Sequence, residues 1–246
     1  MDGVLIRDGE MIEGADHFLR HLSERGRPYF VVSNNSLFTT RQLSKDLANM
    51  GLEVPEVRLW TSAIATAEFV SHQRPNGTAF VIGEESVHEA LASVGYREDV
   101  TRPDYVVLGE TWQYSYEDFA TAIRLVNAGS HFVSTNPEPT GPTPEGSLPG
   151  CGSMAAVIES ATGVSPYVVG KPNSMMIRSA MVRLGAKNES TAIVGDRMDT
   201  DVRAGIDAGI RTILVLSGVH DALDAQRYPY TPWRVADSLA QLAEEI

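Results

Sequence analysis

The segment GDRMDTD, residues 195–201, decides the fold assignment, because it follows the short apolar run Thr191–Val194 and precedes an amphipathic stretch. A strand, an acidic turn and a helix in this order are typical of an α/β protein with a parallel sheet. Such sheets bind ligands beyond the carboxyl ends of their strands, so Asp196 is predicted to face the ligand. Hard carboxylate oxygens suit Mg²⁺, whereas capping of the following helix is an equally ordinary role for Asp199 or Asp201.

The same alternation of short apolar runs and amphipathic stretches extends outward over almost the whole chain. It predicts a doubly wound, mainly parallel sheet flanked by helices. The helix expected over Thr39–Met50, for example, has apolar residues at spacings of four and three, which form one buried stripe. The other expected strands are Arg27–Ser33, Thr78–Ile82, Tyr105–Leu108, His131–Thr135 and Arg211–Leu216. The other expected helices are Gly14–Arg25, Ser62–Ser71, Ser86–Ser93, Tyr116–Asn127, Gly152–Ala161, Ser174–Leu184, Asp201–Ala208 and Leu239–Glu245.

Two segments divide the chain into domains. Gln73–Gly77 combines Pro, Asn and Gly between an expected helix and strand, and two prolines bracket a short strand-like run within Ser165–Pro172. The residues between these joints have their own strand-helix alternation, which predicts a small α/β domain at 73–167 inserted into a larger one at 1–72 and 168–246. The turn-rich stretch Asn136–Gly152 lies in the insert, and loops of that length are usually functional.

Composition narrows the class of protein. The 246 residues are 43% hydrophobic and 21% charged, as in a globular enzyme, and the formal net charge of −12 argues against nucleic-acid binding. We find no apolar run of about 18 residues, so a membrane span is not expected. The first residues lack the pattern of a signal peptide, and the single Cys151 cannot form an intramolecular disulfide, so a cytoplasmic protein is predicted. Cys151 precedes an expected helix in a Gly-rich turn and is predicted to be packed rather than reactive.

The run YFVVSNN, residues 29–35, places polar groups at a second strand end. A hydroxyl from Ser33, an amide from Asn34 and backbone N–H groups at that position suit a phosphate oxygen. Ser and Asn are also favoured helix-capping residues, and this segment alone does not decide between capping and phosphate binding.

Two further groups could complete a phosphate site. Lys171 stands between Gly and Pro after an apolar run, in a rigid turn where its ammonium could neutralise a phosphate and a neighbouring carboxylate, although a surface lysine is the ordinary alternative. Asp2 lies just before an apolar stretch interrupted by Asp8-Gly9, which is a hairpin signal. Asp2 could equally be an exposed terminal acid.

These four pieces, in this order, resemble the motifs of the haloacid dehalogenase superfamily of phosphatases. Nearly the full length is similar to the branch that contains the NagD-like nucleotide and p-nitrophenyl phosphatases. That resemblance implies a Rossmann-like core and an α/β cap inserted between the second and third motifs, where residues 73–167 fall. It also implies Mg²⁺ as cofactor, small phosphorylated metabolites as substrates, substrate selection by the cap around Asn136–Glu138, and pairing of caps in a homodimer.

Carried over by position, the resemblance gives each residue a role. Asp2 matches the general acid and base, and its backbone carbonyl would bind Mg²⁺. Ser33 and Asn34 match the phosphate-binding second motif, and Lys171 matches the third. Asp196 is the matching Mg²⁺ ligand of the fourth motif; its neighbour Asp201 would support the metal shell.

One departure concerns the first motif, which reads Asp-x-Asp-Gly in this family and whose first Asp is the nucleophile. Met1 stands at the x position, so the nucleophile is expected just upstream of Met1 and is absent from the sequence as written. We expect a misassigned start codon or a truncated sequence in preference to a natural pseudoenzyme. A catalytically inactive phosphate-binding or regulatory homologue is therefore the alternative function. A phosphomutase would share the motifs; a dehalogenase would not need the carboxylate at Asp196.

Overall fold

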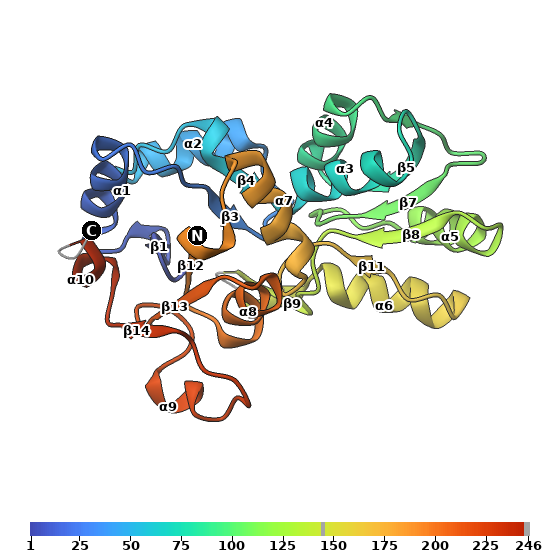
Figure 1. Cartoon of the computed structure of the whole chain (residues 1–246). Coiled ribbons are helices and arrows are strands. Elements are labelled where there is room, and N and C mark those ends of the chain that lie inside the picture. Colours follow the sequence, from blue (N-terminus) through green and yellow to red (C-terminus); the bar gives the residue numbers. More distant parts are fainter. Residues whose placement is uncertain (144–145, 244–246) are drawn as a thin grey trace. The chain divides into compact units, whose positions relative to one another are not determined.

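The computed structural model describes residues 1–143 and 146–243, which fall into two compact units (Figure 1). The first unit comprises Met1–Ser33, Arg41–Trp60 and the residues from Lys171 onward. The second comprises Asn34–Thr40 and Thr61–Gly170. The second unit is thus larger than the predicted insert at 73–167, because residues 34–40, 61–72 and 168–170 also belong to it.

The first unit begins with a hairpin and ends with strands and helices in alternation. Asp8 and Gly9, at φ of 54° and 80°, join β1 to β2 in an antiparallel pair, as the Asp-Gly signal predicts. The elements of this unit are β1 (Ile6–Arg7), β2 (Glu10–Met11), α1 (Ala15–Glu24), β3 (Val31–Ser33), α2 (Thr40–Asn49), η1 (Glu56–Arg58), β4 (Leu59–Thr61), α7 (Ser174–Leu184), η2 (Asn188–Ser190), β12 (Ala192–Gly195), η3 (Met198–Val202), α8 (Arg203–Ala208), β13 (Arg211–Val215), α9 (Ala222–Ala225), β14 (Arg234–Ala236) and α10 (Leu239–Ala243).

Two sheets share the hydrophobic core of the first unit. Strands β12, β13 and β14 form a parallel sheet in that order, and β3 pairs with β4 in another. Val32 of β3 and Ile193 of β12 both pack against one cluster of buried residues from α7, α8 and Ile210. Because β12 and β13 are parallel, the residues that follow them, Asp196 and Leu216, leave the sheet at the same edge.

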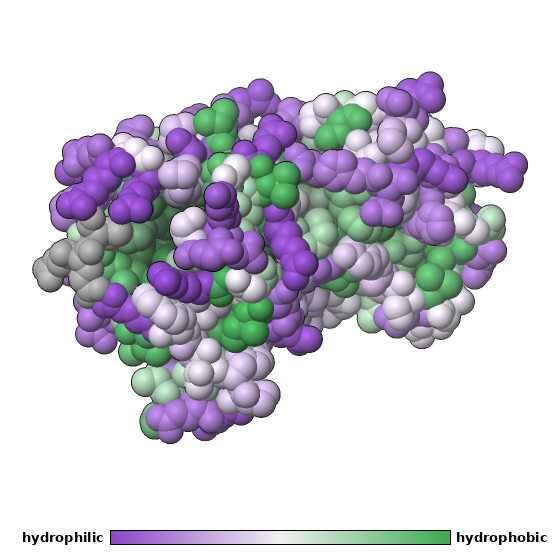
Figure 2. Space-filling view, viewed as in Figure 1, coloured by the Kyte–Doolittle hydropathy of each residue, from purple (hydrophilic) through white to green (hydrophobic). Residues whose placement is uncertain are grey.

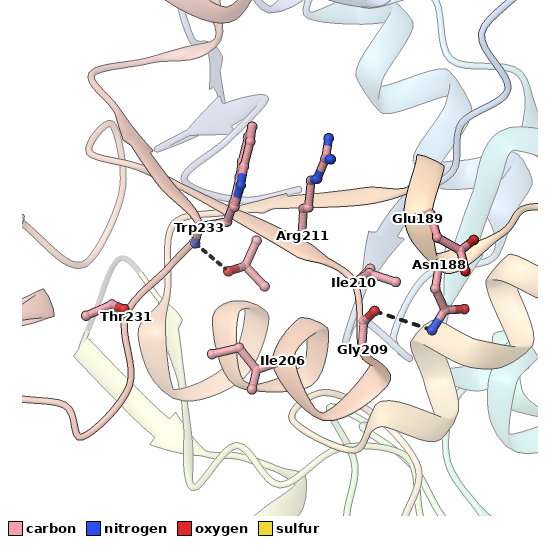
Figure 3. A pocket seen from close by; sticks show the side chains of 9 residues that line it. Asn188, Glu189, Ile206, Gly209, Ile210, Arg211, Thr231 and Trp233 are labelled. Atoms are coloured by element: carbon pink, nitrogen blue, oxygen red, sulfur yellow. Dashed lines mark hydrogen bonds between the residues drawn. The ribbon is translucent and has the colours of Figure 1, made fainter.

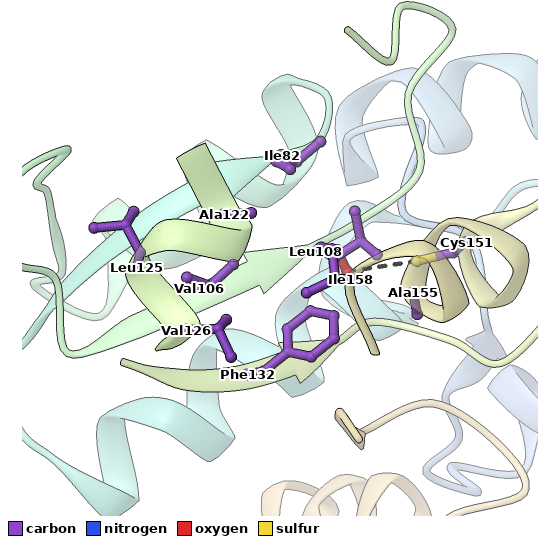
Figure 4. Close-up of a cluster of buried hydrophobic side chains, with 10 residues drawn as sticks. All are labelled: Ile82, Val106, Leu108, Ala122, Leu125, Val126, Phe132, Cys151, Ala155 and Ile158. Atoms are coloured by element: carbon purple, nitrogen blue, oxygen red, sulfur yellow. Dashed lines mark hydrogen bonds between the residues drawn. The ribbon is translucent and has the colours of Figure 1, made fainter. Parts of the chain in front are cut away.

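The second unit is built around a five-stranded parallel sheet in the order β11-β8-β7-β5-β6. A cluster of ten buried side chains fills the space between this sheet and helices α5 and α6 (Figure 4). Cys151 lies in this cluster at 0% exposure, so its predicted packing is confirmed. The elements are α3 (Ser62–Gln73), β5 (Thr78–Ile82), α4 (Glu85–Ser93), β6 (Arg97–Glu98), β7 (Tyr105–Leu108), α5 (Tyr116–Asn127), β8 (His131–Ser134), β9 (Thr140–Thr143), β10 (Gly146–Pro149), α6 (Cys151–Thr162) and β11 (Tyr167–Val168).

The segment 34–40 belongs to the second unit because its polar groups are bonded there. The carboxylate of Glu110, after β7, accepts hydrogen bonds from the Ser36 N–H at 2.8 Å and from the Ser36 hydroxyl at 2.9 Å. That hydroxyl accepts the Glu110 N–H at 3.0 Å and lies 3.0 Å from the Thr135 hydroxyl. Ser36 is completely buried, so these bonds fix the backbone of the segment.

The parallel-sheet α/β fold predicted from the sequence is confirmed, with differences at several boundaries. The strand expected over Arg27–Ser33 is only Val31–Ser33, since Pro28 cannot donate to a ladder. The α-helix expected from Asp201 begins at Arg203, because Met198–Val202 forms a π-helical segment. The long stretch Asn136–Gly152 contains an unpredicted antiparallel hairpin, β9–β10.

Figure 2 shows one face of the molecule, coloured by the hydropathy of each residue. On the face drawn in Figure 2 hydrophilic residues predominate, and the apolar residues form small separate groups, which is normal for globular proteins. Within the described parts of the chain, no helix combines the length and the apolar character needed to cross a bilayer. The expected homodimer stays a prediction.

Candidate active site

Asp196 is the buried centre of the candidate site. It follows β12 directly and is 4% exposed. The backbone N–H of Val219 donates to its Oδ2 at 2.9 Å, and the His220 N–H donates to its backbone oxygen at 3.2 Å. Burial, followed by the negative charge of Asp201, raises the pKa of the Asp196 carboxyl above its usual value. The site therefore holds a buried carboxylate whose negative charge a bound cation would stabilise.

Two glycines allow the chain to approach this carboxylate closely. A Cβ added at Gly3 or at Gly218 would lie inside the 3.0 Å that real Cβ atoms keep from other atoms, in both cases against Asp196 Oδ2. Gly3 also has φ +70°, which disfavours any other residue. The amino-terminal turn and the loop after β13 therefore both lie against Asp196, and exposed Asp2 is adjacent in sequence to this contact.

Lys171 and Asp201 form a buried ion pair next to Asp196. The Lys171 ammonium donates to Asp201 Oδ1 at 2.7 Å, and the two side chains are 11% and 7% exposed. The Arg197 N–H donates to the other oxygen of Asp201 at 3.2 Å. Burial disfavours the charge of Asp201, but the Lys171 ammonium outweighs this and lowers the pKa of its carboxyl. Both oxygens of Asp201 are thus engaged by protein groups, which favours a role in holding Lys171 over direct metal contact.

The predicted phosphate-binding pair, Ser33 and Asn34, is divided between the two units. Ser33 ends β3 in the first unit and is 5% exposed, whereas Asn34 belongs to the second unit. The Asn34 Nδ2 donates to Glu138 Oε1 at 2.7 Å, and its backbone oxygen accepts from the Asn136 Nδ2 at 3.0 Å and from the Ser62 hydroxyl at 2.6 Å. The insert segment around Asn136 and Glu138 therefore contacts Asn34 directly.

Asp199 lies outside this cluster. Its carboxylate pairs with the Arg197 guanidinium at 2.7 Å, with a side chain 42% exposed. Asp199 thus has an ordinary surface ion pair with Arg197.

The loop after β13 is the part of the site that the sequence analysis missed. It supplies Gly218 and the Val219 N–H, and the imidazole Nδ1 of His220 accepts the Met198 N–H at 2.8 Å. The available signal was the Ser217-Gly218 pair directly after an apolar strand, at the same sheet edge as Asp196.

The donor chemistry around Asp196 fits a magnesium ion. In the described ranges, 1–143 and 146–243, no group of three His, Cys, Asp or Glu side chains could hold a metal by itself. Mg²⁺ needs less than that, because it usually takes one or two carboxylates and fills its other positions with water and substrate phosphate. A buried carboxylate with a raised pKa and glycine on two sides matches such a ligand.

A surface groove elsewhere on the first unit does not belong to this site. Its volume is about 720 Å³, and Figure 3 shows Arg211, Trp233 and Asn188 among the residues that line it. Arg211 lies over the Trp233 ring, 4.9 Å from its centroid. Arg211 begins β13 and Asn188 precedes β12, so the groove lies at the amino ends of these parallel strands, whereas Asp196 lies beyond the carboxyl ends.

Comparisons with known proteins cover the chain from end to end. Residues 1–97 match the family described as "Haloacid dehalogenase-like hydrolase", and residues 168–242 match the one described as "HAD-hyrolase-like". The dihydroxyacetone phosphatase of Corynebacterium glutamicum is 50% identical over 244 residues, which are 99% of this chain and 89% of that protein. The ribonucleotide monophosphatase NagD of Escherichia coli is 37% identical over 98% of this chain and 95% of its own length.

Solved structures give the same result for the fold. The structure of NagD from Escherichia coli K-12 superposes with a TM-score of 0.93 and covers 98% of this chain and 95% of its own. The 4-nitrophenylphosphatase of Thermotoga maritima also gives 0.93, at 33% identity, over 99% of this chain and 94% of its own.

Proposed function

Because the chain belongs to the haloacid dehalogenase-like hydrolases, in the family of NagD and the p-nitrophenyl phosphatases, we propose that it uses Mg²⁺ and an aspartyl-phosphate to hydrolyse its substrates. It is a phosphatase, a phosphoric monoester hydrolase that acts on small phosphorylated molecules. The observation that carries the proposal is the buried cluster in which Asp196 lies beside the Lys171–Asp201 ion pair.

Each residue of the first unit has a task in this proposal. Asp196 and the backbone carbonyl of Asp2 would hold Mg²⁺, which would supply positive charge to neutralise the phosphate. Lys171, held by Asp201, supplies a second positive charge for the phosphoryl oxygens. Ser33 donates its hydroxyl to a phosphate oxygen, and Asn34, which follows it in the chain, is the second residue of this motif. Asp2 protonates the departing alcohol and then removes a proton from the water that hydrolyses the intermediate.

The nucleophile of the proposal is the aspartate expected immediately before Met1. By the family pattern Asp-x-Asp-Gly, Met1 is the middle residue and Asp2 the second aspartate. An attacking carboxylate forms the aspartyl-phosphate, which splits one difficult displacement into two easier ones.

A short sugar phosphate is the substrate that we propose first. The dihydroxyacetone phosphatase is more similar to this chain than NagD, at 50% against 37% identity over nearly the same span. Nucleoside monophosphates and p-nitrophenyl phosphate are the next substrates to test. We propose further that the insert acts as the cap that selects among them, that the caps pair in a homodimer, and that the enzyme works in the cytoplasm.

The test measures phosphate release with and without Mg²⁺, for this chain and for a form extended through the upstream codons. We expect release from dihydroxyacetone phosphate in the extended form only, dependent on Mg²⁺ and abolished by Asp196→Asn. A folded protein that is inactive in both forms on all three substrate classes would refute the proposal. Binding of inorganic phosphate by that inactive protein would support the phosphate-binding homologue instead.

A further inference from the structure

The loop after β13 contacts two parts of the candidate site that are far apart in sequence. The Ser217 hydroxyl donates to the backbone oxygen of Gly3 at 2.8 Å, while the Val219 N–H two residues later donates to Asp196 Oδ2 at 2.9 Å. One short segment therefore bonds both to the turn that carries Asp2 and to the buried carboxylate.

We propose that Ser217 is a positioning residue for Asp2, acting through the peptide backbone of Gly3. The proposal rests on the proposed function, because it takes Asp2 to be the general acid. Ser217 touches no reacting atom in this scheme. Its hydroxyl holds the amino-terminal turn in the orientation from which Asp2 delivers its proton.

The backbone geometry of the turn explains how one hydroxyl has this effect. The Gly3 N–H donates to the Ile6 oxygen at 2.7 Å, and the Gly3 oxygen accepts from Ser217, so both polar groups of Gly3 are tied. The Asp2–Gly3 peptide is planar and trans, hence its carbonyl points away from the Ile6 oxygen. Fixing Gly3 on both sides therefore fixes the peptide plane on which the Asp2 side chain stands.

The loop is itself held on several sides, so Ser217 is a rigid anchor. Its backbone oxygen accepts from Arg7 Nη1 at 3.0 Å, and the Cβ of any other residue at Gly218 would collide with Asp196. The His220 N–H donates to the Asp196 oxygen at 3.2 Å. These restraints fix the loop relative to Asp196. Among the described contacts, Ser217 is the one side chain of the loop that bonds to Gly3, so it holds the amino-terminal turn against the loop.

A comparison of leaving groups separates positioning from plain stabilisation. An alkoxide must be protonated as it departs, whereas p-nitrophenolate departs readily as an anion, so misplacement of the general acid harms alkyl esters more. Ser217→Ala removes the hydroxyl and Ser217→Thr keeps one. The matched control is Ser44→Ala, because the Ser44 hydroxyl also donates to a backbone oxygen, that of Val54 at 2.6 Å, in a partly buried position of the same unit.

The assay compares kcat/KM for dihydroxyacetone phosphate and p-nitrophenyl phosphate in whichever form of the chain is active. In Ser217→Ala we expect about a tenfold loss on the alkyl ester and about twofold or less on the aryl ester. Ser217→Thr should restore most of the loss, and Ser44→Ala should leave the ratio of the two substrates unchanged. Equal losses on both substrates, or none, would overturn the proposal.

An inactive parent protein would count against the proposed function, and amide hydrogen exchange then tests by itself whether Ser217 restrains the turn that carries Asp2. Ser217→Ala should speed exchange at the Gly3 and Val219 amides relative to Ser44→Ala, because the restraint between turn and loop is lost. Unchanged exchange at both amides would overturn the proposal independently of activity.

Discussion

The close approach of glycine to Asp196 can be measured by adding single methyl groups at three positions. Gly9→Ala introduces a Cβ at φ +80° with nothing within 4 Å, so it measures the backbone cost alone. Gly218→Ala has no positive φ but collides with Asp196, so it measures the steric cost alone. Gly3→Ala combines φ +70° with the same collision. The three variants therefore separate the two effects within one unit.

The expected magnitudes follow from these differences. The left-handed backbone costs a non-glycine residue about 1–2 kcal/mol, and an overpacked site costs about 1–3 kcal/mol. We therefore expect free energies of unfolding lowered by about 1 kcal/mol for Gly9→Ala, about 2 kcal/mol for Gly218→Ala and about 3–4 kcal/mol for Gly3→Ala. At about 2–4 °C per kcal/mol, the Tm of Gly3→Ala should fall by roughly 6–16 °C.

The assay is urea and thermal unfolding of the three variants beside the parent. Mg²⁺-dependent phosphate release is measured on the same variants in the extended form, which is the form expected to be active. Gly3→Ala and Gly218→Ala should also lose activity, because Asp196 must move to admit the methyl group. Gly9→Ala should keep its activity. Similar stability losses for Gly3→Ala and Gly9→Ala would refute the close packing of Gly3 on Asp196.

Three further predictions concern charged groups. Asp196→Asn should lower Mg²⁺-dependent phosphate release by at least about a hundredfold, while the Tm stays near that of the parent. A variant that stays active would exclude Asp196 as the metal ligand. Lys171→Met should lower the free energy of unfolding by about 3–5 kcal/mol, because it leaves the buried charge of Asp201 without its partner. A double variant with Asp201→Leu should regain most of that stability but no activity. A single variant as stable as the parent would contradict the buried pair. In the second unit, partial burial disfavours the charge of Asp104, but a backbone N–H and the Arg74 guanidinium outweigh it and lower the pKa of this carboxyl. The stabilisation by the Asp104 carboxylate is then complete above the unfolded pKa of about 3.9 and is lost as the pH falls through the lower folded pKa. Asp104→Asn should therefore lower the free energy of unfolding at neutral pH. In urea titrations the difference between variant and parent should shrink as the pH falls towards about 3.

Much of the local structure could be predicted because it depends on short-range patterns. The strands Thr78–Ile82 and Tyr105–Leu108 and the helices Tyr116–Asn127 and Ser174–Leu184 begin and end where their apolar runs and periodicity predict. The hairpin at Asp8-Gly9 follows from the positive φ that such a turn requires. The β9–β10 hairpin escaped prediction, since Pro and Gly in those strands give no β-like alternation.

The sequence by itself singled out Asp196 and Lys171 as candidate site residues, because they stand at a strand end and in a turn that local patterns reveal. Only the tertiary structure decided their partners. Lys171 pairs with Asp201, and Asn34 bonds to Glu138 of the insert. Gly3 and Gly218 pack against Asp196. The physical reason is that periodicity and turn chemistry are fixed by neighbours in the chain, whereas a buried charge finds its partner among groups that the packing of distant segments brings within hydrogen-bonding distance.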